Sequence, residues 1–307
     1  MVLVAGGVAL LSVGLPTLAK SWVAHAIVAA PNARIEIVAA ADAAPQVYQA
    51  LGVSQQVRME VGSGTSRISM SIWIFRPELA ARGTVLLLHG IRSDRTQLVD
   101  LAKQVAARGY CAVLPDLRGH GRSSGKWLTY GVLEAADLSQ VLDQLPRSNV
   151  AVERVGVIGF SYGAAVGIQL AGRDRRIRAV VAAAPFSSLR NVVPSFIRHY
   201  LGPGALLLSS TLINSAIDEA GELGGFNPDA ASSLDAIQKT RAQVLLIHGK
   251  RDSNIPFGQS EALHAAAPDH SRLILLAGED HISISHDGTR TIAIEGMRWL
   301  DDGLGGP

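Results

Sequence analysis

The composition of this 307-residue chain is that of a globular protein with a large apolar core. Hydrophobic residues make up 48% of it and charged residues only 18%, which excludes a largely disordered protein. The net charge is +2 and there is no clustered stripe of Lys and Arg, so we expect no nucleic-acid partner. Cys111 is the single cysteine, which excludes an intrachain disulfide.

The first 33 residues form an apolar segment interrupted by a single charge. Residues 1–19 and 21–33 carry no charged side chain, and Lys20 lies between them. This length is sufficient for a helix that crosses a bilayer. A signal peptide is an alternative, although no Lys or Arg precedes the apolar run, as a signal peptide normally requires. A buried N-terminal helix is the third alternative, and the sequence leaves all three open.

The apolar segment and the residues after it determine the predicted domain organisation. We interpret residues 1–33 as a membrane anchor or signal, residues 34–54 as a linker rich in Ala, and residues 55–303 as the main domain. The anchor interpretation predicts a membrane-associated protein that contacts the bilayer through residues 1–30. The alternatives are a secreted or periplasmic protein and a cytoplasmic one.

The apolar pattern of the main domain predicts strands that alternate with helices. Residues 57–61 and 68–74 alternate apolar with other residues, which is typical of half-buried antiparallel strands. The short continuous apolar runs that follow suit parallel strands covered on both faces: 84–88, 111–114, 155–158, 179–184, 244–247 and 273–276. Helical periodicity lies between them, around 98–105 and 138–145, and a last helix is expected over 289–300. The sequence therefore predicts an α/β fold with a mostly parallel, doubly wound sheet.

One connection between the predicted strands is too long for a simple crossover. It covers about residues 186–240, and within it 191–200 and 205–217 have helical patterns, the second of them rich in Leu. We predict a small helical cap inserted into the sheet domain. The cap is either an extra layer packed on the domain or a cover that supplies an apolar substrate pocket, and the two interpretations are compatible.

The most informative stretch is Gly159-Phe160-Ser161-Tyr162-Gly163. It follows the predicted strand 155–158 and precedes a helical run. A strand, a sharp Gly-x-Ser-x-Gly turn and a helix form the nucleophile elbow of an α/β-hydrolase fold, where the turn lifts the serine hydroxyl clear of the sheet. Side chains at the two glycine positions would collide with the adjoining strand and helix. Ser161 is therefore the candidate nucleophile.

A serine nucleophile needs a base, and the base needs an acid to orient it. His281 follows the last predicted strand, at the sheet edge where doubly wound sheets gather their sites, and His286 is a weaker neighbouring candidate. Asp252 follows the preceding predicted strand and is the candidate acid. The chain order Ser161, Asp252, His281 is the order that the α/β-hydrolase fold imposes.

A tetrahedral intermediate also requires hydrogen-bond donors for its oxyanion. One candidate is the backbone N–H of Tyr162, directly after the nucleophile. The other is the backbone N–H of Ile91, in the loop after the predicted strand 84–88.

The motifs of residues 82–302 resemble those of serine α/β-hydrolases of the monoglyceride-lipase, esterase and serine-aminopeptidase type. The matching segments are 88–90, 116–123, 159–163, 248–252 and 278–281. The resemblance implies hydrolysis of an ester, amide or thioester through an acyl-enzyme. The apolar N-terminal segment further resembles that of membrane-anchored members of the group.

We expect a hydrolase of carboxylic esters with acyl or lipid-like substrates. A peptidase or amidase of the same fold is one alternative, and a catalytically silent, hydrolase-like binding protein is another. No cofactor and no metal are expected, because the sequence contains neither a His-Glu-x-x-His motif nor a Gly-x-Gly-x-x-Gly motif after a strand. The expected partner is a small-molecule acyl ester.

Overall fold

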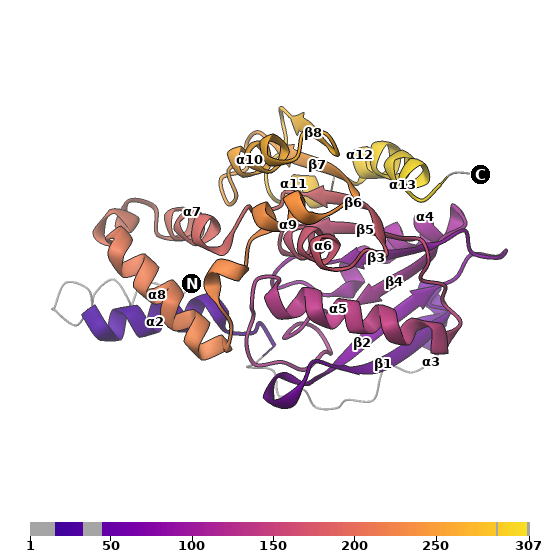
Figure 1. Ribbon diagram of the computed structural model, residues 1–307, viewed down its shortest axis with the longest axis horizontal. Coiled ribbons are helices and arrows are strands. Elements are labelled where there is room, and N and C mark those ends of the chain that lie inside the picture. The colour runs from indigo at the N-terminus through magenta and orange to yellow at the C-terminus, as the bar shows by residue number, and fades with distance from the viewer. Residues whose placement is uncertain (1–15, 33–44, 287, 306–307) are drawn as a thin grey trace.

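The computed structural model describes residues 16–32, 45–286 and 288–305, which are built around one twisted sheet (Figure 1). The strand order is β1-β2-β4-β3-β5-β6-β7-β8. The strands are β1 (Gln55–Val61), β2 (Ile68–Phe75), β3 (Thr84–Leu88), β4 (Cys111–Pro115), β5 (Val155–Phe160), β6 (Ile177–Ala183), β7 (Gln243–Gly249) and β8 (Ser271–Leu276). Only the pairings of β2 with β1 and β4 are antiparallel, and the others are parallel. The predicted α/β fold with a mostly parallel sheet is confirmed.

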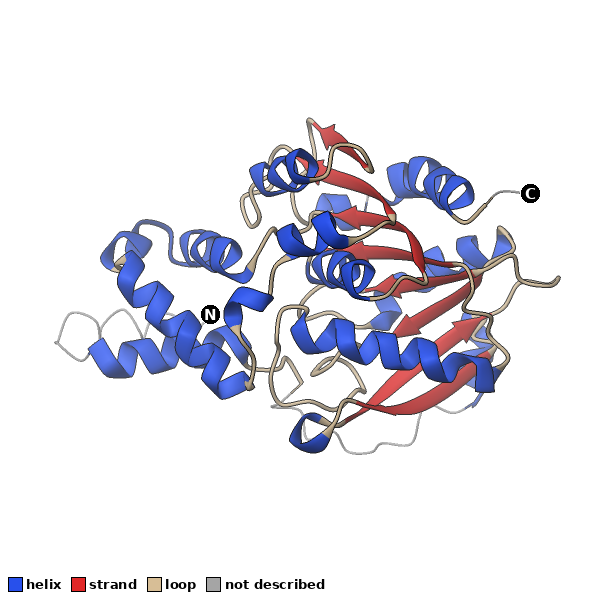
Figure 2. Cartoon of the chain, viewed as in Figure 1, coloured by secondary structure: helices blue, strands red, loops and turns tan. Residues whose placement is uncertain are grey.

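Helices lie on both faces of this sheet (Figure 2). The α-helices are α2 (Pro16–Val28), α3 (Pro45–Leu51), α4 (Val99–Ala107), α5 (Val132–Gln144), α6 (Tyr162–Arg173), α7 (Leu189–Leu201), α8 (Ser210–Gly224), α9 (Ser233–Lys239), α10 (Gly258–Ala266), α11 (Ser283–His286), α12 (Gly288–Thr291) and α13 (Met297–Gly303). Short 3₁₀ segments are η1 (Gly64–Ser66), η2 (Arg95–Leu98), η3 (Leu145–Ser148), η4 (Gly202–Leu207) and η5 (Pro228–Ala230), and η6 (Ile292–Gly296) is a π-helical turn. The predicted C-terminal helix thus consists of α12, η6 and α13.

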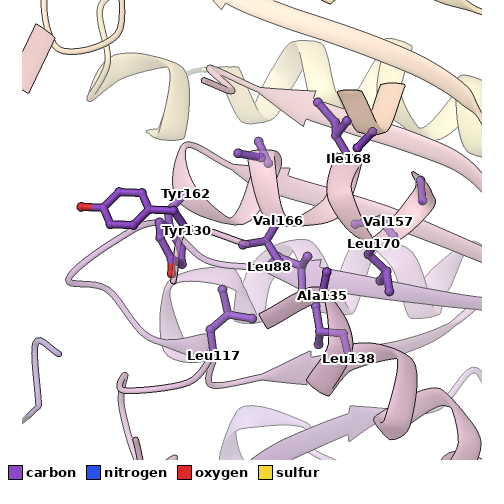
Figure 3. Packing of buried hydrophobic residues seen from close by; sticks show 14 of the residues in the cluster. Leu88, Leu117, Tyr130, Ala135, Leu138, Val157, Tyr162, Val166, Ile168 and Leu170 are labelled. Atoms are coloured by element: carbon purple, nitrogen blue, oxygen red, sulfur yellow. The ribbon is translucent and has the colours of Figure 1, made fainter. Parts of the chain in front are cut away.

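The central strands are apolar on both faces because each face is covered. Successive side chains of a strand point to opposite sides, so Val157 of β5 packs in one core cluster and Ile158 packs in the other. Helices α5, α6 and α9 cover the first cluster, part of which is shown in Figure 3, and α4 and α13 cover the second. This two-sided burial explains the continuous apolar runs of the sequence.

Helix α2 belongs to the segment that the sequence predicts as a membrane anchor or signal. Residues 1–15 of that segment lie outside the described residues. Helix α2 packs along α8, with Ala24 and Val28 fully buried and Lys20 paired with Glu219 at 2.9 Å. For residues 16–28, this packing corresponds to the alternative of a buried N-terminal helix. Within the described ranges, no helix is both long enough and apolar enough to span a bilayer.

The predicted linker also contains regular structure in its described part. Residues 33–44 lie outside the described residues, and α3 follows them. Tyr48 and Leu51 of α3 pack against the second core cluster, and the Tyr48 ring meets the Trp73 ring edge-on at 5.7 Å between centroids. This end of the predicted linker is therefore packed on the sheet domain.

The connection between β6 and β7 forms a helical layer at one end of the sheet. Helices α7 and α8 lie there together with α2, on the left of Figure 1. Helix α8 begins at Ser210 because the hydroxyl of Ser209 caps it by accepting the backbone N–H of Leu212. Helix α9 packs instead on α6, with Ala236 and Ile237 in the first core cluster. Of the connection predicted as a cap, α7, η4 and α8 therefore form the helical layer.

Candidate active site

The predicted nucleophile elbow is a strained turn between β5 and α6. Ser161 has φ +52° and ψ −113°, a backbone conformation that non-glycine residues rarely adopt. Its N–H donates to the Ala183 carbonyl at 2.7 Å. A Cβ on Gly163 would meet the carbonyl oxygen of Leu88 and, at 2.5 Å, that of His89. The turn therefore requires glycine where the helix starts against β3.

Three side chains from the ends of separate strands meet at this turn. Ser161 follows β5, Asp252 follows β7 and His281 follows β8. The Nε2 atom of His281 lies 2.9 Å from Ser161 Oγ, and its Nδ1 atom lies 2.6 Å from Asp252 Oδ2. A carboxylate can only accept, so Nδ1 donates to it and Nε2 is free to accept the serine proton. The side chain of the weaker candidate, His286, lies outside the described residues.

The carboxylate of Asp252 is buried and fully hydrogen-bonded. Its Oδ1 accepts the backbone N–H groups of Asn254 at 2.9 Å and Ile255 at 2.8 Å. Burial by itself raises the pKa of the Asp252 carboxyl, but hydrogen bonds from His248, His281 and the Ile255 amide outweigh it and lower the pKa to about 2. Asp252 is thus ionised at neutral pH despite its burial.

His248 supports this carboxylate, a contact that the sequence did not indicate. Its Nε2 donates to the Ile255 carbonyl at 2.8 Å and lies 3.3 Å from Asp252 Oδ2. Because Nε2 carries the proton, Nδ1 accepts the Ser260 hydroxyl at 2.6 Å. His248 precedes Asp252 by four residues, and a glycine follows it, which is also the pattern of an ordinary turn. Only the fold shows that its ring faces the carboxylate.

The residues of the two predicted oxyanion donors are the chain neighbour of Ser161 and a residue that lines the same pocket. Tyr162 is the first residue of α6, and the first amides of a helix have no acceptor within the helix. Ile91 lines the same pocket as Ser161. A Cβ built on the neighbouring Gly90 would lie 3.7 Å from Ser161 Cβ, so this loop passes directly against the serine.

A buried histidine joins the Gly90 loop to the loop after β4. The Nδ1 atom of His89 donates to the Gly90 carbonyl at 2.9 Å, and Nε2 accepts the backbone N–H of Leu117 at 3.0 Å. This arrangement requires a neutral ring. Burial lowers the pKa of His89 to about 4, and it likewise lowers that of His120, whose ring packs against His89 at 4.9 Å.

Ser161 and His281 both line a pocket of about 660 Å³. Its walls are mostly apolar and come from the ends of the strands, the cap and α2. The cap contributes Val193, Phe196, Ile197, Tyr200, Leu201 and Leu208, and α2 contributes Trp22, Val23, Ala26 and Ile27. Among the described residues, no group of three or more His, Cys, Asp or Glu side chains is placed to hold a metal ion.

A nucleophile elbow at the carboxyl end of a mostly parallel sheet defines the class of α/β hydrolases. The sequence model of the alpha/beta hydrolase family matches residues 85–303. The chain therefore belongs to this family.

Relatives and solved structures agree with this assignment. An uncharacterized protein of Mycobacterium tuberculosis (strain H37Rv) is 30% identical over 241 residues, which cover 77% of this chain and 75% of the relative. An esterase of Pyrococcus furiosus superposes with a TM-score of 0.65 at 22% identity, over 84% of this chain and 94% of that one. An acylaminoacyl peptidase of Pyrococcus horikoshii superposes with a TM-score of 0.61 at 16% identity, over 84% of this chain and 43% of that one. At these identities the solved structures show a shared fold.

Replacing Gly163 by alanine should destabilise the protein. The added Cβ would collide with two backbone carbonyls that cannot move independently of β3, and overpacking of this kind costs about 1–3 kcal/mol. Urea denaturation of Gly163→Ala should show this loss of unfolding free energy. Gly204→Ala is the control, because a Cβ there meets no atom closer than 3.8 Å. Equal stability of the two variants would contradict the elbow geometry.

The low pKa values of the buried histidines predict that the unfolding free energy falls in mild acid. An unfolded histidine has a pKa of about 6.5, whereas that of folded His89 is about 4. Between these values the unfolded chain binds more protons, so lowering the pH from about 7 to about 5 should reduce the unfolding free energy by about 2 kcal/mol through His89. Urea denaturation at both pH values should show a smaller reduction in His89→Asn. The exposed His199 provides the control, His199→Asn. The prediction is wrong if His89→Asn keeps the full pH dependence.

Proposed function

We propose that the protein is a serine hydrolase that cleaves carboxylic esters through an acyl-enzyme intermediate. Ser161 is the nucleophile, His281 the general base and Asp252 the acid that orients it. The observation that carries this proposal is the continuous hydrogen-bonded chain from Ser161 Oγ through the His281 ring to a buried, ionised Asp252. The chain opens onto an apolar pocket.

The reaction follows from these contacts in two halves. Ser161 Oγ attacks the ester carbonyl carbon while its proton passes to His281 Nε2, and Asp252 stabilises the resulting imidazolium. The backbone amides of Ile91 and Tyr162 donate to the oxyanion. The C–O bond then breaks as His281 returns the proton to the leaving alcohol. A water molecule repeats these steps on the acyl-enzyme and releases the acid.

The pocket favours an ester over a peptide with a free amino terminus. An aminopeptidase site needs a carboxylate to pair with the substrate ammonium group. Among the described residues, no Asp or Glu lines the pocket, and its walls are mostly aliphatic and aromatic. The esterases of Pyrococcus furiosus and Thermogutta terrifontis share this fold. The sequence resemblance to monoglyceride lipases and esterases supports the same choice.

Removal of the Ser161 hydroxyl should abolish ester hydrolysis. We expect Ser161→Ala to lower kcat for a nitrophenyl butyrate by a factor on the order of 10⁶, because loss of the nucleophile removes the acyl-enzyme route. A fluorophosphonate probe should label the wild type and leave this variant unlabelled. Ser63→Ala, in an exposed turn, is the control and should behave as wild type. A wild type that neither turns over the ester nor takes up the probe would establish the silent binding protein instead.

Replacing Asp252 by asparagine should impair the orientation of the base, His281, and leave the fold intact. The Asn Oδ1 atom still accepts the amides of Asn254 and Ile255, so the loop is retained. The side-chain amide no longer stabilises the Nδ1–H tautomer of His281, and kcat should fall by a factor on the order of 10⁴. Steady-state kinetics measure the fall, and circular dichroism checks that the fold is intact. Full activity in a folded Asp252→Asn protein would remove Asp252 from the mechanism.

A further inference from the structure

Helix α2 forms part of the wall of the pocket that contains Ser161. Trp22, Val23, Ala26 and Ile27 of α2 all line it. These residues precede the family match, which begins at residue 85. The N-terminal segment, outside the matched residues, therefore supplies this wall.

Helix α2 is held in place by contacts on more than one side. Its buried Ala24 and Val28 lie in the first core cluster, and the helix runs along α8. The Tyr130 hydroxyl donates to the Ile27 carbonyl at 2.8 Å. Just beyond the helix, the side-chain amide of Asn32 donates to the Ser123 carbonyl at 2.8 Å. Residues 22, 23 and 26 are thus presented to the pocket by a helix fixed at both its flank and its end.

The exposed part of the pocket lining is partly apolar. Arg92 and Gln97 are exposed where they line the pocket. Three large hydrophobic residues line it and are also exposed: Trp22 (39%), Tyr200 (58%) and Ile282 (67%). They belong to α2, to α7 and to the loop after His281. Contact with these three side chains removes the apolar surface of a hydrocarbon chain from water, which is favourable.

The size and lining of the pocket exceed the needs of a small acyl group. A volume of about 660 Å³ is in the range that holds a ligand of drug size, about 300–1,000 Å³. Branched and aromatic side chains from α2 and α7 line it, and they gain from contact with methylene groups.

We propose that this pocket binds a long hydrocarbon chain of the ester and that α2 limits the length of the chain it accepts. The inference rests on the proposed ester hydrolysis. Val23 and Ala26 are its specificity-determining residues, since they face the pocket from α2 with small side chains.

Chain-length kinetics test the inference. The wild type should hydrolyse nitrophenyl esters with a kcat/KM that rises about fourfold per added methylene from acetate to octanoate, the factor expected for burial of one CH₂ group. Ala26→Trp fills space in the pocket and should lower the ratio of kcat/KM for dodecanoate to that for acetate by about tenfold. Ala81→Trp, in an exposed loop, is the matched control and should keep the wild-type profile.

A second variant and a second substrate series keep the test decisive. Val23→Ala enlarges the pocket and should move the preferred ester to a longer chain, even if Ala26→Trp does not fold. Butyrate esters of short and long alcohols repeat the measurement with the chain on the leaving group. Dependence on residues 23 and 26 in either series supports the inference and identifies the part of the ester that occupies the pocket.

Failure of the inference can be told apart from failure of the proposed function. Acetate turnover with no dependence on chain length in either series overturns the inference and leaves ester hydrolysis standing. Without any turnover or probe labelling, the proposed function fails. Calorimetry of Ser161→Ala with dodecanoate then tests the pocket without catalysis, and we expect binding. Adding Ala26→Trp to this protein should weaken the binding, and adding Ala81→Trp should not. Equal binding in all three proteins would overturn the assignment of α2.

Discussion

The close approach of α6 to the end of β3 is the constraint on which the site depends. It is possible only because Gly163 has no side chain to meet the carbonyl oxygens of Leu88 and His89. The same approach forces Ser161 into its unusual backbone conformation and brings the Gly90 loop against it. One steric requirement therefore positions both the candidate nucleophile and the loop that carries a candidate oxyanion donor.

Buried titratable groups near this turn differ in charge: two histidines are neutral, and one aspartate is ionised. His89 and His120 have no acidic hydrogen-bond partner among the described residues, so burial leaves them neutral, with pKa values of about 4. Asp252 is also buried, yet two imidazoles and two backbone amides donate toward it and keep it ionised. The neutral rings support the loops, and the ionised carboxylate orients the one histidine that reaches Ser161. The surroundings of each group, and not burial alone, decide its charge.

The helical layer at the carboxyl end of the sheet combines segments that are far apart in the chain. Helices α7 and α8 come from the connection between β6 and β7, whereas α2 precedes the first strand. Their shared packing turns an open sheet edge into a mostly apolar pocket. Specificity can then vary through this layer while the elbow and its neighbouring strands stay the same, because the layer contributes no part of the hydrogen-bonded chain from Ser161 to Asp252.

Local patterns in the sequence determined the sheet, the elbow and the order of Ser161, Asp252 and His281. Apolar periodicity and glycine spacing act within a few residues, and parallel strands bring their carboxyl ends to one edge. Tertiary structure alone decided that residues 16–28 pack on α8, that α3 joins the sheet domain and that the His248 ring faces Asp252. An apolar helix can bury its surface in a bilayer or against another helix, and its sequence is the same in both cases. The choice depends on whether a complementary apolar face exists elsewhere in the folded chain, and here α8 provides it.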